Sequence, residues 1–299
     1  MIGDIFNSSS TTSLAEEILA LLDEDNDMRL GFKEIRWKTW LKYLMKPVSA
    51  LIVVDVQNDF IDGSLALKRC PAGQDGASVV PVINQLLSDV NFDVEIYSLD
   101  WHDEKHISFI DNLPLRKLHI SSPVSAENAQ VYDVVVFSDH APHTQMLWPR
   151  HCVQGTWGSQ LHSDLKVGST SKSIQIHKGT NTDVDSYSAF FDNQRISQTE
   201  LESILRARNV TDVYVCGLAY DVCVRYTTLD ALDLGFRTYL IDDASKGVKL
   251  EDIDQTKNKI IEKGARVINS SQVKELAESK VCDSDIALWT AKILSLANK

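Results

Sequence analysis

The sequence predicts an α/β fold of three layers, in which a mainly parallel β-sheet is covered by helices on both faces. Two observations predict it. From residue 49 onward, short and almost continuously apolar runs of β-forming residues alternate with stretches of helical spacing. Strands without polar alternation are typical of sheets buried on both faces, and helical connections are typical of parallel pairing. The 299 residues, 43% of them hydrophobic, suffice for a sizeable core.

The predicted elements follow one another in a regular order. Strands are expected at residues 49–56, 94–100, 173–178, 212–218, 236–243 and 265–268. Helices are expected at residues 78–90, 199–209, 251–263 and in a stretch that begins near Tyr220. Because ligands of parallel sheets bind at the carboxyl ends of the strands, functional residues are expected in the loops that follow each strand.

Three segments depart from this alternating pattern. Residues 1–47 are predicted to form a small N-terminal helix–loop–helix that ends at Pro47, and residues 48–299 to form the main domain. Within the main domain, the polar segment near 111–141 resembles an insertion, and residues 271–299 are expected to form C-terminal helices. We therefore expect one large α/β domain with a helical appendage.

Charge and hydropathy exclude several classes of partner. The formal net charge is −12 and no long Lys/Arg block occurs, so nucleic acid is not an expected partner. The first twenty residues lack the pattern of a secretory signal, and no apolar run approaches the ~18–20 residues that span a bilayer. We therefore expect a cytoplasmic protein without a membrane partner, with the nucleus as an alternative compartment.

Cysteine usage points to reactivity rather than to cross-linking. The chain has five cysteines, an odd number, and no CxxC pair, which argues against a disulfide framework and a zinc ribbon. One of them, Cys223, lies where an apolar strand gives way to a predicted helix. A lone cysteine is more often a small buried hydrophobe, so its role depends on its neighbours.

Three residues at predicted strand ends supply such neighbours. Asp55 ends the run IVVD, Lys178 ends QIHK, and Cys223 follows YVCGL. Taken alone, the aspartate is more typical of a turn residue, the lysine of a solvated side chain, and the cysteine of an inert buried thiol. Together they form a candidate nucleophile with a base, a cation and a helix N-terminus beside it, which a thiol needs because its pKa of about 8.5 leaves little thiolate at neutral pH.

A second group of side chains has the composition of a metal site. Asp100 and His102 are two residues apart after a predicted strand, so both point to one side of an extended segment. His151 is a candidate third ligand, and His106 is a further ligand, a support for the ligands or a structural residue. Two histidines and one carboxylate leave coordination positions open, as catalytic metal sites do; ordinary surface polarity is the alternative for an isolated DxH.

The leader contains a calcium-loop pattern. Residues 23–34, DEDNDMRLGFKE, place acidic and carbonyl ligands at EF-hand spacing: Asp23, Asp25, Asp27, Arg29 through its carbonyl, and Glu34. Met28 stands where the loop usually has glycine, and only one loop is visible although EF-hands generally pair. The alternative is an acidic helix–loop–helix without useful calcium affinity.

Six motifs together resemble one enzyme family. They are VVDVQNDF, DWHDEKHISF, LWPRHCVQGTWGSQL, HKG, YSAF and CGLAYDVCVRYT, which span about residues 49–270 in family order. The chain resembles the nicotinamidase/pyrazinamidase branch of the isochorismatase-like cysteine hydrolases. The resemblance implies hydrolysis of nicotinamide to nicotinate and ammonia, in NAD salvage, through a thioester on the cysteine.

The resemblance also implies individual roles in the amide chemistry. Cys223 would attack the carboxamide carbon, Asp55 would take the thiol proton and pass it to departing ammonia, and Lys178 would stabilise both. The backbone N–H groups of Ala219 and Cys223 would form the oxyanion hole, with a cis peptide bond between Leu218 and Ala219.

The implied pocket combines a metal with aromatic side chains. Asp100, His102 and His151 match the family's ligands for one divalent transition metal, with zinc as the first choice and iron or manganese as alternatives, and the metal would accept the pyridine nitrogen. The aromatic residues that match those flanking the ring are Phe60, Trp148 and Tyr187, although each alone is more typical of core packing. Segment 111–141 and the spacing after Lys178 depart from the family pattern, which leaves the substrate range open.

Two rival functions remain at this stage. One is an isochorismatase-like hydrolase of another small amide, which metal content would distinguish. The other is a calcium-responsive binding protein with a pseudoenzyme domain, against which the intact Asp55, Lys178 and Cys223 set argues. A homo-oligomer is an alternative to a monomer.

Overall fold

A six-stranded sheet forms the centre of the computed structural model, which describes residues 11–29, 36–138, 141–278 and 284–296. The strand order is β5-β2-β1-β6-β7-β8, and every neighbouring pair is parallel. The strands are β1(Ser49–Val54), β2(Val94–Asp100), β5(Ser173–Lys178), β6(Asp212–Leu218), β7(Arg237–Lys246) and β8(Arg266–Ile268). These bounds agree closely with the predicted strands.

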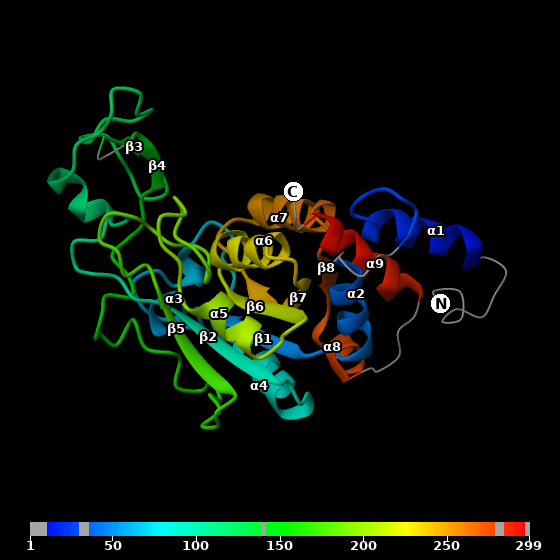
Figure 1. Ribbon diagram of the computed structural model, residues 1–299. Helices are drawn as coiled ribbons and strands as arrows, with labels where there is room; N and C mark the ends of the chain where they lie inside the picture. Colours follow the sequence, from blue (N-terminus) through cyan, green and yellow to red (C-terminus); the bar gives the residue numbers. More distant parts are fainter. Residues whose placement is uncertain (1–10, 30–35, 139–140, 279–283, 297–299) are drawn as a thin grey trace.

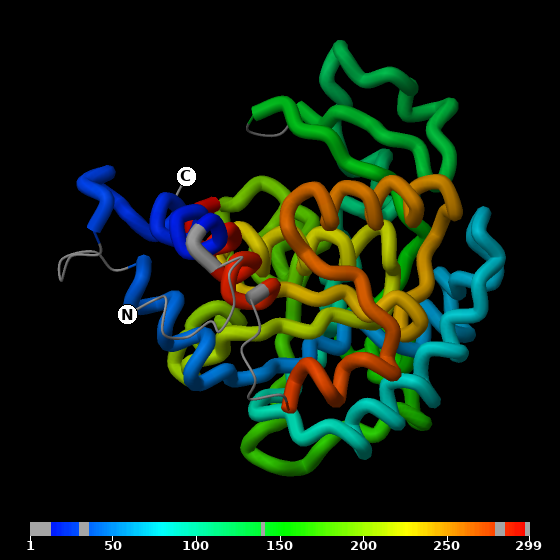
Figure 2. Tube along the Cα trace, turned by 90° about the vertical axis from the view of Figure 1, so that its right-hand side faces the viewer, coloured from blue at the N-terminus to red at the C-terminus, as the bar shows by residue number. Residues whose placement is uncertain are grey.

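Helices cover both faces of the sheet, as the apolar strand pattern predicts. Every residue of β1 and β6 is buried, so neither strand presents a face to solvent. The helices α4(Val79–Asp89) and α8(Ser270–Glu278) pack on one face, and α6(Arg225–Asp233) and α7(Leu250–Glu262) on the other (Figures 1 and 2). The remaining helix of the main pattern is α5(Leu201–Ala207). The predicted three-layer α/β fold is confirmed.

Short helical turns connect the strands near their carboxyl ends. They are α3(Asn58–Ile61), the 3₁₀ turns η2(Leu67–Arg69) and η3(Gly76–Ser78), and the π-helical turn η5(Tyr220–Val224). The turn η5 leads directly into α6 and contains Cys223. The predicted helix near Tyr220 is therefore a π-turn followed by an α-helix.

The predicted insertion folds as a separate lobe beside the sheet. It contains the 3₁₀ turn η4(Ile110–Leu115) and an antiparallel pair, β3(Val134–Phe137) with β4(His143–Met146), which projects from the sheet in Figure 1. The lobe has its own apolar cluster, formed by Ile107, Leu113, Val135, Phe137 and Leu147. The sequence pattern did not predict this hairpin, because its two strands are only four residues long and largely polar in β4.

The leader and the C-terminal helix form a second apolar core. The helices α1(Thr11–Leu22) and α2(Arg36–Met45) pack against α9(Ser284–Leu296), and Figure 2 shows the three side by side. The buried members of this cluster are Ile18, Leu22, Trp40, Tyr43, Leu44, Ala287, Ala291 and Leu294. The indole N–H of Trp40 donates to the carbonyl of Ala287 at 2.8 Å. The division at residue 47 stays a prediction, but α9 shares its core with the leader.

A buried ion pair ties this helical unit to the sheet. Arg237 and Asp212, the first residues of β7 and β6, lie 2.6 Å apart, and Arg237 also donates to the carbonyl of Tyr43 in α2 at 3.1 Å. The unit therefore docks at the amino ends of the strands, opposite the edge where parallel sheets bind ligands. Within the described residues, no helix has the length and apolar content needed to cross a bilayer.

Gly217 allows the closest approach between β1 and β6. Its φ is +118°, and a Cβ built there would lie 2.1 Å from the carbonyl oxygen of Val54, the residue with which it is paired in register. That oxygen belongs to the backbone of a central strand, so it has little freedom to move.

We expect Gly217→Ala to destabilise the fold by about 1–3 kcal/mol or more, through overpacking added to a strained φ. Gly73→Ala is the matched control, because Gly73 also has a positive φ but nothing lies within 4 Å of the position that its Cβ would take. Thermal unfolding of the two variants separates the clash from the strain. Equal melting temperatures would contradict the steric explanation.

Candidate active site and metal centre

The carboxyl ends of three strands bring Asp55, Lys178 and Cys223 together. Asp55 follows β1 with φ +49°, Lys178 is the last residue of β5, and Cys223 lies in η5 after β6. The side chains have relative exposures of 0%, 1% and 6%. The structure therefore places these three predicted residues in one buried cluster.

Lys178 is the centre of this cluster. Its Nζ lies 2.9 Å from Oδ2 of Asp55, 2.5 Å from Oδ1 of Asp100 and 3.4 Å from Sγ of Cys223. It also donates to the carbonyl of Ser186 at 3.0 Å. Burial opposes its charge, but the carboxylates of Asp100 and Asp55 outweigh burial and hold the pKa of Lys178 well above its usual value.

Asp55 has the properties of a general base. Ser98 Oγ donates to its Oδ1 at 2.6 Å, whereas no hydrogen-bond donor in the described part of the chain meets its Oδ2 at a suitable angle. Burial raises the pKa of Asp55 to about 6, although the ammonium of Lys178 lowers it. Asp55 is therefore ionised at neutral pH, and its Oδ2, although ion-paired with Lys178, receives no well-aligned hydrogen bond in the described residues and can accept a proton.

Burial keeps Cys223 in its thiol form. It raises the pKa of the thiol well above its usual value, and the Lys178 ammonium only partly offsets this effect. The cation and the helical turn therefore do not suffice to produce a resting thiolate. Nucleophilic attack from Cys223 requires a base that removes the proton, and Asp55 is the ionised carboxylate in the cluster.

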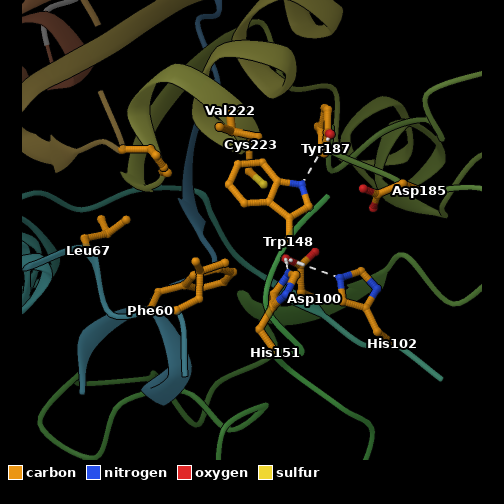
Figure 3. A pocket seen from close by; sticks show the side chains of 13 residues that line it. Phe60, Leu67, Asp100, His102, Trp148, His151, Asp185, Tyr187, Val222 and Cys223 are labelled. Atoms are coloured by element: carbon orange, nitrogen blue, oxygen red, sulfur yellow. Dashed lines mark hydrogen bonds and ion pairs between the residues drawn. The ribbon is translucent and has the colours of Figure 1, made fainter. Parts of the chain in front are cut away.

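Asp100, His102 and His151 form a second cluster next to the first. Asp100 Oδ2 lies 3.6 Å from Nε2 of His102 and 3.7 Å from Nε2 of His151, and Figure 3 shows Asp100 between the two rings. The Nδ1 atoms contact backbone carbonyls, His102 at Gly179 (2.9 Å) and His151 at Pro149 (2.7 Å). A carbonyl only accepts, so each Nδ1 carries a proton, and Nε2 is the atom of each ring that faces the carboxylate.

The geometry of these three side chains suits a metal ion. All three are buried, and their ligand atoms lie within 4.8 Å of one another. Zinc bonds of about 2.0–2.2 Å at tetrahedral angles separate ligand atoms by about 3.4 Å, close to the distances found here. Asp100 can serve as a ligand because Lys178 and His102 hold the pKa of its carboxyl well below its usual value, against the effect of burial.

His106 lies behind the candidate ligand set rather than beside Asp100. Its ring stacks on His102 at 4.0 Å, and its Nδ1 pairs with Ser108 Oγ at 2.8 Å. Its Nε2 is buried without a hydrogen-bond partner in the described residues, and His106, His102 and Asp185 form an alternative ligand group. Burial holds the pKa of His106 well below its usual value, so the ring is neutral and able to bind a cation.

Cys223 of the first cluster and all three residues of the second line one cavity. The predicted aromatic residues line it: Trp148 donates from Nε1 to the hydroxyl of Tyr187 at 3.4 Å, and the ring of Phe60 lies 5.5 Å from that of His151 (Figure 3). Ala219 lines it beside Cys223, and the peptide bond between Leu218 and Ala219 is cis.

Sequence reasoning missed part of this cavity wall. The additional lining residues are Leu65, Leu67, Asp185, Val222 and Val248. The apolar ones lie in loops or beside the nucleophile and carry no chemical signal. Asp185 has a usable signal in the sequence, because it is an acid two residues before the predicted pocket residue Tyr187, and the structure buries it.

The leader brings three of its predicted calcium ligands together. Asp23, Asp25 and Asp27 place carboxylate oxygens within 4.8 Å of one another. Met28, at the usual glycine position, has φ +62°, and its N–H donates to Asp23 Oδ2 at 2.8 Å. The Arg29 side chain is exposed, and Glu34 lies outside the described residues.

Comparisons with known sequences found similar proteins. Residues 121–272 match the family model of the isochorismatase domain. A nicotinamidase of Acinetobacter baylyi is 39% identical over 202 residues, which cover 67% of this chain and 82% of the relative.

Two solved structures also have a similar fold. A nicotinamidase/pyrazinamidase of Acinetobacter baumanii has a TM-score of 0.62 at 36% identity, covering 75% of this chain and 97% of that one. A pyrazinamidase of Pyrococcus horikoshii in complex with zinc has a TM-score of 0.54 at 32% identity, covering 75% and 99%.

The state of the thiol is directly testable. We expect the ultraviolet difference spectrum between the metal-free wild type and Cys223→Ser to show no thiolate at neutral pH, because burial raises the pKa of Cys223 well above its usual value. The other cysteines cancel in the difference. A thiolate signal at pH 7 would show that Lys178 outweighs burial.

Proposed function

The chain belongs to the isochorismatase family, and from this premise we propose that it is a nicotinamidase, which hydrolyses nicotinamide to nicotinate and ammonia. One observation carries the proposal. A single cavity is lined both by Cys223 and by the metal-ligand set of Asp100, His102 and His151. A small ligand with a carboxamide at one side and a ring nitrogen at the other matches these two features.

The first chemical step is acyl transfer to sulfur. Asp55 takes the proton of the Cys223 thiol, and the sulfur attacks the amide carbon to form a C–S bond. The N–H groups of Ala219 and Cys223 stabilise the oxyanion that develops on the carbonyl oxygen. Asp55 then gives the proton to the departing nitrogen, so that ammonia leaves and a thioester remains.

The second step returns the enzyme to its starting state. Asp55 accepts a proton from water, the resulting hydroxide equivalent attacks the thioester, and the C–S bond breaks. Asp55 returns the proton to the departing sulfur, so Cys223 is again a thiol, and the product acid releases its own proton to solvent and leaves as nicotinate. Lys178 keeps its charge throughout, because its contacts with Asp55 and Asp100 stabilise the ammonium. The buried position of all three residues limits competing contacts with bulk water.

The metal proposal concerns substrate orientation. Asp100, His102 and His151 would hold one divalent transition metal, with His106 as a further ligand or support. Zinc is the first choice because the Pyrococcus horikoshii relative was solved with zinc, and iron and manganese are alternatives for the same ligand types. When bound, the ion supplies a Lewis acid that accepts a pyridine nitrogen. The aromatic residues Phe60, Trp148 and Tyr187 would confine the ring.

The two rival functions receive no comparable support. Nicotinamidases match the chain at 39%, 38%, 36% and 32% identity, which favours nicotinamide over another small amide. The clustered Asp55, Lys178 and Cys223 argue against a pseudoenzyme. We further propose a cytoplasmic or nuclear role in NAD salvage, without nucleic acid or membrane partners, by a monomer or a homo-oligomer.

For the leader we propose weak calcium binding. The grouped carboxylates of Asp23, Asp25 and Asp27 support it. The affinity should be low, since a side chain held at φ +62° at Met28 costs on the order of 1 kcal/mol relative to glycine. Because none of these loop residues lines the cavity, calcium should affect stability or assembly rather than the chemical step.

The activity test is ammonia release from nicotinamide. We expect turnover by the wild type, and a loss of several orders of magnitude in Cys223→Ala, since the covalent route needs the nucleophile. Cys70→Ala is the matched control, because Cys70 has the same 6% exposure and lies outside the cavity. Mass spectrometry of quenched wild-type enzyme should detect the acyl adduct on Cys223, and appreciable turnover by Cys223→Ala would exclude the mechanism.

The metal test is elemental analysis together with nicotinamide binding. We expect His151→Ala to lose most of its bound metal and to bind nicotinamide more weakly, because a site with two histidines and one carboxylate retains little affinity after losing a ligand. His119→Ala, in the inserted lobe, should keep the metal. Full occupancy in His151→Ala would place the ligands elsewhere.

The calcium test is calorimetric titration of the full chain. We expect a weak heat that disappears in Glu34→Gln, which removes the ligand expected at the last loop position, and tighter binding by Met28→Gly. Identical heats in the wild type and Glu34→Gln would contradict the assignment of residues 23–34 as a calcium-binding loop.

A further inference from the structure

The segment between Asp55 and Phe60 makes contacts that the proposed chemistry does not use. Three of its four residues, Gln57, Asn58 and Asp59, bond to the segments that carry the candidate metal ligands or to the loop that follows them. We infer that Gln57 and Asp59 are positioning residues for the metal, which fix the backbone beside Asp100 and His151 in the arrangement that ion binding needs. The inference rests on the proposed metal site.

Gln57 fixes Asp100 on both sides of its Cα. The Gln57 Oε1 accepts the N–H of Asp100 at 2.8 Å, and Nε2 donates to the carbonyl of Asp100 at 2.8 Å. The other N–H of Nε2 donates to the carbonyl of Ser159, also at 2.8 Å. The amide is fully buried, so these bonds have no competition from solvent. One side chain therefore joins the end of β2 to the loop after His151.

Asp59 fixes the backbone next to the other half of the site. Its Oδ2 accepts the N–H of Cys152, the residue after His151, at 2.7 Å, and its Oδ1 accepts the N–H of Ser64 at 3.0 Å. A Cβ at Gly158 would lie 2.0 Å from Oδ2, so the carboxylate packs directly on this loop. The bond to Cys152 holds the peptide that orients the His151 ring.

These contacts supplement a direct link between the two halves. The N–H of His102 donates to the carbonyl of Cys152 at 3.0 Å, and the N–H of Gln154 donates to that of His102 at 2.9 Å. Gln57 and Asp59 add two further points of attachment from the segment after β1. Because metal bonds tolerate only small errors in ligand position, the added constraint should appear in metal affinity.

Asn58 provides a matched control from the same segment. Like Gln57 it is buried, with 6% exposure, and its Nδ2 donates to the carbonyl of Trp157 at 2.8 Å. It therefore bonds to the same loop but not to Asp100 or Cys152. A general effect of disturbing this segment should appear in Asn58→Ala as strongly as in variants of its neighbours.

Two near-isosteric substitutions test the inference. Gln57→Glu retains an acceptor for the Asp100 N–H but turns a second oxygen toward the carbonyls of Asp100 and Ser159, which removes both donated bonds. Asp59→Asn keeps the size of the side chain and weakens its charge-assisted bond to Cys152. Zn²⁺ affinity is measured for each full-length variant by competition with a chromophoric chelator, and the His102→Ala variant gives the background binding.

We expect Gln57→Glu and Asp59→Asn to bind Zn²⁺ about 10–100-fold more weakly, and Asn58→Ala to bind it as the wild type does. Thermal unfolding of the metal-free proteins should show Gln57→Glu and Asp59→Asn folded. Saturating Zn²⁺ should restore their nicotinamide turnover, because the substitutions leave Cys223 and Asp55 intact.

Three results would overturn the inference. The first is an unchanged Zn²⁺ affinity in Gln57→Glu and Asp59→Asn. The second is an equal loss of Zn²⁺ affinity in Asn58→Ala. The third is unfolding of both test variants without metal, which would make these residues general supports of the fold. The Zn²⁺ titration needs no substrate. Absence of nicotinamide turnover with normal Zn²⁺ binding would therefore contradict the proposed function and not this inference.

Discussion

The ammonium group of Lys178 is the interaction on which the site depends. A buried carboxylate is costly without a cation, and Lys178 lies against two of them, Asp55 and Asp100. One belongs to the cluster around the nucleophile and the other to the metal-ligand group. Two carboxylates and one ammonium leave a net charge of about −1, an electrostatic environment that favours a cation. The two halves of the site therefore share one charge balance.

Much of this arrangement follows from topology. In a parallel sheet the carboxyl ends of the strands meet at one edge. Because Asp55, Lys178 and Cys223 each end or follow an apolar run in the sequence, their proximity could be predicted. Asp100 and His102 lie at the same edge because they end or follow β2, whereas His151 joins them from the loop after β4, outside the six-stranded sheet. The protonation state of Cys223 could not be predicted, because it depends on how completely the surrounding segments exclude water.

Long-range packing is the part that sequence pattern did not reveal. The apolar face of α9 is visible in the sequence, but nothing local indicates that it packs with α1 and α2. The hairpin of β3 and β4 is too short and too polar for a periodicity signal. Val248 and Leu65 line the cavity from loops, where an apolar residue has no distinguishing neighbour. In each case the missing information is a contact between distant segments.

The shared core of α1, α2 and α9 makes the two ends of the chain interdependent. Removing the leader would expose Ala287, Ala291 and Leu294 of α9, and removing α9 would expose Trp40 and Leu44. Arg237 would also lose its bond to the carbonyl of Tyr43 if the leader were absent. A shortened protein that retains only the sheet and its covering helices would therefore have to omit both ends together. An insertion or deletion at one terminus constrains which changes the other can tolerate.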